Sequence, residues 1–158
     1  MGFWQRLLAG VPLEAHNPER LLPELLASYQ EEVRLAQQLR THADHAPHQA
    51  GAQGLRAAAE EQERLVSWLR DEIVAQGGEG NDNGSSISIK EGKNHWARVV
   101  HDMQDNLALQ QRYNEQAIRY DPARPEVAAL FRTLAREKGR TSALLRSIAS
   151  LADPHALD

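Results

Sequence analysis

Four segments of this chain place apolar residues at alternating intervals of three and four, and one polar residue interrupts each segment. Steps of three or four residues return to the same face of an α-helix, so the pattern predicts four amphipathic helices around one core. The interrupting residues are Glu32, Gln62, Asn106 and Lys138. Inward polar positions of a four-helix bundle are where metal or ligand sites are built. The sequence therefore predicts an all-α bundle with an unusual polar site in its core.

Capping and breaking residues set the expected limits of the helices. Asn17 suits an N-cap, Gly77 suits a helix stop, and proline follows the end of the first, third and fourth segments. The expected helices span about 17–46, 49–76, 94–120 and 124–153. In the third of them, the expected inward face carries Trp96, Val99, Met103, Asn106, Gln110, Tyr113 and Ala117.

The connections between the segments differ in length, and this predicts the topology. The first and third connections are short, which favours two antiparallel hairpins. The middle connection, 77–93, is rich in Gly, Asn and Ser, and at about 3.3 Å per residue it can span the bundle lengthwise. The second and third helices are then parallel; an up-and-down bundle with a flexible middle loop is the alternative. The expected division is an amphipathic segment at 1–16 and a bundle at 17–153.

The two halves of the chain repeat one pattern, and the repeat carries a family resemblance. Tyr113 follows Asn106 by seven residues, and Leu69 and Leu145 each follow a polar interruption by the same interval. From about residue 20 to 151 the chain resembles the ferritin-like superfamily, most nearly its rubrerythrin-like branch. That resemblance implies two hairpins joined by a long crossover, the fold class we expect.

The resemblance also implies a di-metal site, but this chain replaces most of the ligands. In that family each hairpin carries a Glu on its first helix and a Glu-x-x-His on its second. The corresponding positions here are Glu32, Gln62, Leu65, Asn106, Lys138 and Thr141. One ligand survives, Glu32, and no Glu in the chain is followed three residues later by His, so another register does not restore the motif. We therefore expect a degenerate di-iron site with no bound metal, no cofactor and no catalytic residue.

Our hypothesis for these positions is a metal-free buried polar cluster. The ammonium of Lys138 would pair with Glu32, while Gln62 and Asn106 complete the hydrogen bonding and Thr141 bonds to its own helix backbone. A buried carboxylate and a buried ammonium are each costly alone and tolerable as a pair.

Two alternatives to the cluster remain open at the level of sequence. Lys138 could extend to solvent while Glu32 pairs with Arg64 or Arg136 at the surface. Alternatively, Lys138 could serve as an anion-binding or nucleophilic amine in a pocket.

Charge, cysteine content and hydropathy limit the kinds of partner, site and cellular location that we expect for this protein. The net charge of −4 gives no support to a nucleic-acid partner. The absence of cysteine excludes disulfides and thiolate metal sites. No apolar stretch is long enough to span a membrane, so a cytoplasmic protein is expected. The stretch around Phe3, Trp4 and Leu7 is expected to pack on the bundle or on a second subunit, which favours a homodimer or a protein partner.

Histidines offer a weak second candidate for a metal site. His42, His45 and His48 recur every three residues near the end of the first helix, and we interpret them as solvated. His95 and His101 are interpreted as surface or capping residues.

Two functions from different classes follow from the sequence. The favoured one is a non-enzymatic ferritin-like binding or structural module of unknown cellular role. The alternative is a di-metal (iron or manganese) oxidoreductase or an iron-handling protein with unusual ligands, which rests on Glu32 and on the family resemblance.

Overall fold

The computed structural model describes residues 20–80 and 87–157, and four long helices account for most of them. The helices are α2 (Leu21–Asp44), α3 (Gln49–Ala75), α4 (His95–Tyr120) and α5 (Pro125–Leu151). The expected amphipathic segment at 1–16 and the expected cap at Asn17 lie outside the described residues, as does part of the crossover. Over the described residues, no helix has the length and apolar character needed to cross a bilayer.

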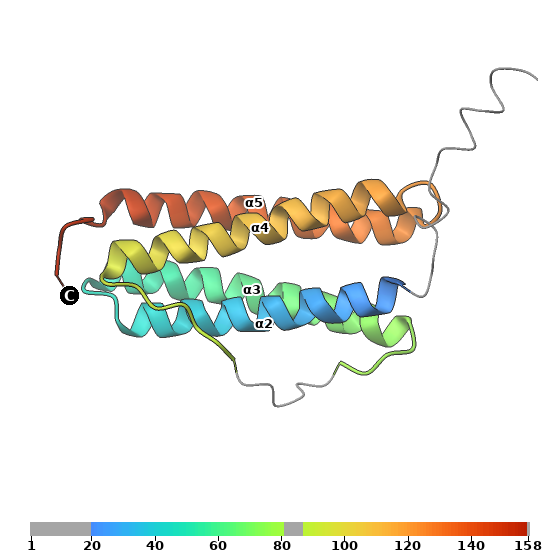
Figure 1. The fold of residues 1–158 in the computed structure, drawn as a ribbon, viewed down its shortest axis with the longest axis horizontal. Coiled ribbons are helices and arrows are strands. Elements are labelled where there is room, and N and C mark those ends of the chain that lie inside the picture. Colours follow the sequence, from blue (N-terminus) through green and yellow to red (C-terminus); the bar gives the residue numbers. More distant parts are fainter. Residues whose placement is uncertain (1–19, 81–86, 158) are drawn as a thin grey trace, which may run out of the picture.

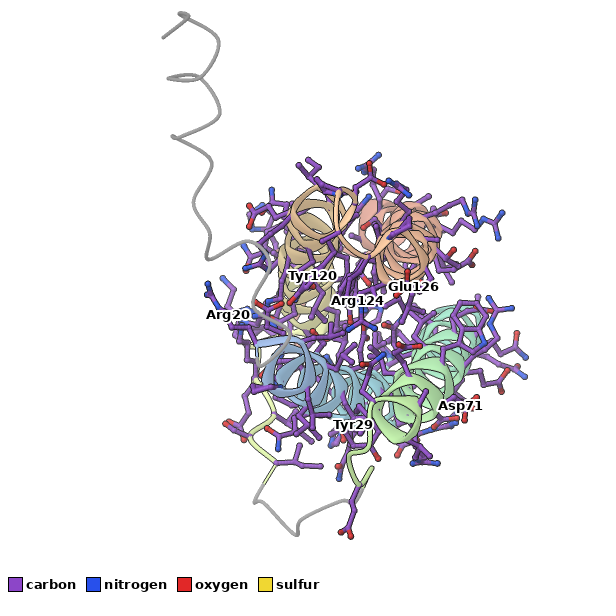
Figure 2. The ribbon with its side chains drawn as sticks, turned by 90° about the vertical axis from the view of Figure 1, so that its right-hand side faces the viewer. Arg20, Tyr29, Asp71, Tyr120, Arg124 and Glu126 are labelled. Carbon is purple, nitrogen blue, oxygen red and sulfur yellow. The ribbon has the colours of Figure 1, made fainter. Side chains whose placement is uncertain are left out.

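The four helices form two antiparallel hairpins joined lengthwise by the long connection. In Figure 1, α2 and α3 make one hairpin, α4 and α5 make the other, and the segment after α3 ends at the opposite tip of the bundle, where α4 begins. The helices α3 and α4 therefore run parallel. Seen end-on, α2 lies beside α4 and α3 lies beside α5 (Figure 2). This confirms the predicted bundle with one long crossover, rather than an up-and-down arrangement.

Local sequence ends α3 as predicted. Gly77 has a φ of +83°, in the left-handed region that glycine tolerates best. The N–H of Gly78 donates to the carbonyl of Ile73 at 2.9 Å, and that of Gly77 donates to Val74 at 3.0 Å. These two bonds form a Schellman motif, which satisfies the last carbonyls of the helix and directs the chain into the crossover.

Apolar side chains from all four helices fill the interior. Leu25, Leu55 and Leu145 are fully inaccessible, and each such side chain stabilises the fold by about 1.5–3 kcal/mol. Phe131 stacks between two tyrosines of α4, with ring centroids 6.1 Å from Tyr113 and 5.8 Å from Tyr120. This core encloses the polar residues described below, because they occur at the same helical interval.

The inward face of α4 differs from the prediction. Trp96, Met103 and Gln110 are only partly buried. One residue before each of them, His95, Asp102 and Leu109 are buried. At Asp102 the cost of burial is offset by hydrogen bonds with Gln38 and His42 of α2.

Candidate functional site: a buried lysine–glutamate cluster

One polar residue from each helix lies inside the bundle at the level predicted for a metal site. Glu32 of α2, Gln62 of α3, Asn106 of α4 and Lys138 of α5 are each 0% exposed. Thr141, one turn along α5 from the lysine, is 4% exposed. The fold thus brings all five residues into the interior, and their contacts divide into two groups.

The first group centres on the ammonium of Lys138. Its Nζ lies 2.6 Å from Oε2 of Glu32 and also donates to Oε1 of Gln62. The lysine therefore points inward instead of extending to solvent. The two arginines considered as surface partners of Glu32 contact Glu137 instead. Charge is thus neutralised inside the bundle by one ion pair between α2 and α5.

Two neutral donors complete this first group. The hydroxyl of Tyr113 donates to Oε1 of Glu32 at 2.8 Å, so both carboxylate oxygens have a partner. The amide of Gln62 donates to the hydroxyl of Thr141 at 3.3 Å, so Thr141 has a partner on another helix, beyond the bond to its own backbone that we expected. Sequence reasoning missed the hydroxyl of Tyr113, which it placed only on the inward face of its helix, seven residues after Asn106.

Asn106 forms the second group and does not reach the ion pair. Its amide nitrogen donates to the backbone carbonyl of Lys138 at 2.8 Å and to the hydroxyl of Ser142 at 2.7 Å. Its Oδ1 is buried without a hydrogen-bond partner among the described residues. Asn106 thus joins α4 to α5 within one hairpin, and it does not complete the hydrogen bonding of Glu32 as expected.

Burial and pairing act in opposite directions on the lysine. Burial lowers the pKa of Lys138 from its ordinary value, while the charge and hydrogen bond of Glu32 raise it in part. The pKa of Tyr113 is well above its ordinary range, because burial and the adjacent Glu32 carboxylate both disfavour the phenolate. The tyrosine is therefore held as a hydrogen-bond donor to the carboxylate.

The residues at this level do not fit a di-metal centre. Such a centre takes carboxylate and imidazole donors, but the six corresponding positions of this chain hold one carboxylate, two amides, one hydroxyl, one ammonium and one leucine. The carboxylate of Glu32 is already engaged by Lys138 and Tyr113. Among the described residues, no group of three or more His, Asp or Glu side chains could hold a metal ion.

A second buried polar cluster lies nearer the carboxyl end of α2, and sequence reasoning missed it. His42 is 2% exposed, so our interpretation of it as a solvated residue was wrong. Its Nδ1 lies 2.8 Å from Oδ2 of Asp102, and Gln38 donates to Oδ1 of the same carboxylate at 2.8 Å. His95 is 8% exposed, so the interpretation of that residue as a surface or cap position was also wrong. Asn94 is the cap, and its Oδ1 accepts from the N–H of Ala97 at 2.8 Å.

Asp105 connects this second cluster to the crossover. It forms ion pairs with Arg34 of α2, at 3.0 Å, and with Lys90 of the crossover. Burial alone would raise the pKa of Asp105, but donors from Lys90, Arg34 and Gln38 hold it below its ordinary value. The Asp105 carboxylate also raises the pKa of Lys138, so the two clusters interact electrostatically.

Comparison with known proteins supports the fold and leaves the function open. The structure is similar to that of Dps from Thermosynechococcus elongatus, with a TM-score of 0.75. The match covers 87% of this chain and 93% of that chain at 11% identity. No family model and no curated protein sequence matches this chain. The predicted fold class, a ferritin-like all-α four-helix bundle, is confirmed by this similarity.

Proposed function

We propose that this protein is a non-enzymatic ferritin-like module in which a metal-free polar cluster takes the place of a di-metal centre. The observation that carries the proposal is the ion pair between Lys138 and Glu32, two side chains that are both fully inaccessible to solvent. An ammonium provides a fixed positive charge at this level without a metal ion. The family branch that the ligand positions resemble is rubrerythrin-like, with its ligands replaced.

The hydrogen bonds of the cluster indicate what it does for the fold. Lys138 of α5 contacts Glu32 and Gln62 of the other hairpin, and Tyr113 of α4 contacts Glu32. Gln62 and Thr141 also join α3 to α5. All four contacts run between the two hairpins, so we infer that the cluster fixes their relative register and gives a rigid scaffold for binding.

Elemental analysis tests the proposal directly. The protein is purified without chelator after growth with added iron and manganese, and Glu32→Gln is analysed beside it. We expect substoichiometric metal in both samples. About two ions per chain that are lost in Glu32→Gln would overturn the proposal and restore the alternative, an iron or manganese oxidoreductase or iron-handling protein. Metal retained in Glu32→Gln would be assigned to surface groups and would leave Glu32 outside the metal site, as we propose.

We further propose that the protein is cytoplasmic and that it forms a homodimer or binds a protein partner. Two apolar side chains of α4, Leu107 and Ile118, are 48% and 77% exposed. They lie three helical turns apart on one face, which is the kind of surface that a partner covers. Light scattering of the wild type and of Ile118→Arg measures the oligomeric state. A dimer that dissociates in the variant supports an interface on α4.

A further inference from the structure

The solvent face of α5 carries several arginines and no exposed acidic residue over most of its length. Between residues 129 and 150 the exposed positions of the helix are Ala129, Arg132, Arg136, Arg140, Ala143, Arg146, Ser147 and Ser150. The whole chain has a net charge of −4, so composition alone does not account for this concentration of positive charge. The exposed side chains between the arginines are small, so they leave the guanidinium groups open to a partner.

One buried carboxylate gathers three guanidinium groups at the seam between α3 and α5. Glu137 is 7% exposed, and it accepts from Arg140 at 2.9 Å and from Arg64 of α3 at 3.2 Å. Arg136 approaches the same carboxylate at 4.0 Å. Arg64 also pairs with Glu61. These two carboxylates balance only two of the three positive charges, so a positive charge remains at the seam.

The spacing of the arginines along α5 matches the spacing of carboxylates on another polypeptide. Arg132, Arg136 and Arg140 follow one another at intervals of four residues, which is about 6 Å along the helix axis. Acidic residues four apart on a partner helix have the same interval, and alternate residues of an extended strand are about 6–7 Å apart. A guanidinium group can also donate two parallel hydrogen bonds to one carboxylate, which an ammonium cannot do.

The seam also contains residue types that are common at protein interfaces. The guanidinium of Arg64 lies 5.2 Å from the centre of the Trp68 ring, and Trp68 is partly buried against the core. Tryptophan and arginine are enriched among the residues that contribute most to protein–protein binding. A nucleic acid fits less well, because a long polyanion would extend beyond this face and meet the negative charge of the rest of the chain.

We propose that the outward face of α5, together with Arg64 of α3, is a docking surface for a short acidic segment of a protein partner. Carboxylates of the partner pair with Arg136 and Arg140, which are 65% and 70% exposed. Glu137 already holds Arg140 in place, which reduces the side-chain entropy that binding costs. The surface lies outside the Lys138 cluster and on other helices than the exposed side chains of α4, so the inference does not depend on a metal-free interior.

Fluorescence anisotropy with a labelled oligoglutamate peptide of about twelve residues, which as a helix is longer than the span from Arg132 to Arg140, tests the proposal. A glutamine peptide of the same length and a single-stranded oligothymidylate of the same charge are titrated beside it at low ionic strength. We expect the oligoglutamate to bind more tightly than the oligothymidylate, its affinity to fall as salt is added, and the glutamine peptide not to bind.

Substitution of the exposed arginines locates the binding site. The double variant Arg136→Gln/Arg140→Gln should weaken oligoglutamate binding by about tenfold, because two exposed ion pairs are lost. The matched control is Arg40→Gln/Arg56→Gln, which changes the net charge equally. Its two arginines pair with Glu63 and Asp44 at the seam between α2 and α3. The control should change the affinity by less than about twofold.

Three outcomes of these titrations would overturn the docking surface. They are no binding of oligoglutamate at low ionic strength, an equal loss of affinity in the control variant, and tighter binding of the oligothymidylate that is lost in Arg136→Gln/Arg140→Gln. The last of these would assign the face to a nucleic acid. Nitrogen-15 amide spectra of the wild type provide a measurement that needs no variant. Shifts caused by the peptide should concentrate in residues 129–150, and shifts confined to other helices would refute the proposal.

Discussion

Replacing Lys138 by methionine is the most direct perturbation of the buried cluster. Methionine is unbranched and of similar length, so the main change is the loss of the ammonium. Glu32 then keeps only its bond from Tyr113, and Oε1 of Gln62 loses its donor. Breaking a buried ion pair in this way costs about 3–5 kcal/mol. That is a large fraction of the 5–15 kcal/mol by which a domain of this size is stable.

A double-mutant cycle with Glu32→Met separates the interaction energy between Lys138 and Glu32 from the other effects of each substitution. Each single variant leaves one charge buried without its partner, so each should lose about 3–5 kcal/mol. The double variant leaves no unpaired charge; the hydroxyl of Tyr113 and the carbonyl of Gln62 lose their partners at about 1–3 kcal/mol each. The double variant should therefore lose less than the sum of the singles, by about 3 kcal/mol or more.

Urea unfolding followed by circular dichroism measures all four corners of the cycle. Lys138→Arg is not a useful control, because a guanidinium group is larger than an ammonium and the site is closed. The matched control is Arg136→Met, which removes an exposed cation two residues away. Arg136→Met should change stability by less than about 0.5 kcal/mol. Losses below about 1 kcal/mol for both buried variants, or strictly additive losses, would refute the reasoning and indicate a lysine that reaches solvent.

Three further predictions concern other parts of the bundle. Burial and the hydrogen bond to Glu24 raise the pKa of Tyr120 to about 12, so the contribution of Tyr120 to stability should be complete below about pH 10 and be lost between pH 10 and about 12. An absorbance titration should show a tyrosinate step near pH 12 that shifts down in Glu24→Gln. A step near pH 10 in the wild type would contradict this prediction. The lowered pKa of Asp105 means that its contribution is present above about pH 4 and lost as pH falls, so Asp105→Asn should flatten the acid limb of stability measured by urea unfolding. Gly77→Ala should cost about 1–2 kcal/mol, because φ is +83°, and an unchanged urea midpoint would show that the turn relaxes freely.

The fold could be predicted because its two determinants, the spacing of apolar residues and the lengths of the connections, can both be read from the local sequence. The three-and-four spacing of apolar residues depends only on helical geometry. The length of the connection between α3 and α4, compared with its short neighbours, decides which helices run parallel. Neither argument needs to know how far each helix is rotated about its axis, and both therefore survive errors of one or two residues at the helix ends.

The site was predictable only in part, because hydrogen-bond partners depend on that rotation. Spacing alone brought Glu32 and Lys138 to the same level, and charge paired them. It could not show that Asn106 turns toward the backbone of α5, which requires the angle between two neighbouring helices. It also treated His42 as solvated, since a periodicity argument assigns polar residues beside the apolar stripe to the surface. The ring of His42 also lies against the crossover, with Nε2 2.8 Å from the carbonyl of Lys90, and the crossover has no periodicity of its own.

The position of the ion pair explains why a polar cluster is compatible with a stable core. Leucine side chains repeat along the helices at the same interval, so a slide of one hairpin by one turn would replace one leucine contact with another at modest cost. The same slide would move Lys138 by about 5.4 Å from a partner that it now contacts at 2.6 Å. Both charges would then be buried without partners, which costs several kcal/mol. Pairing across the hairpins therefore adds little net stability while strongly disfavouring the other registers.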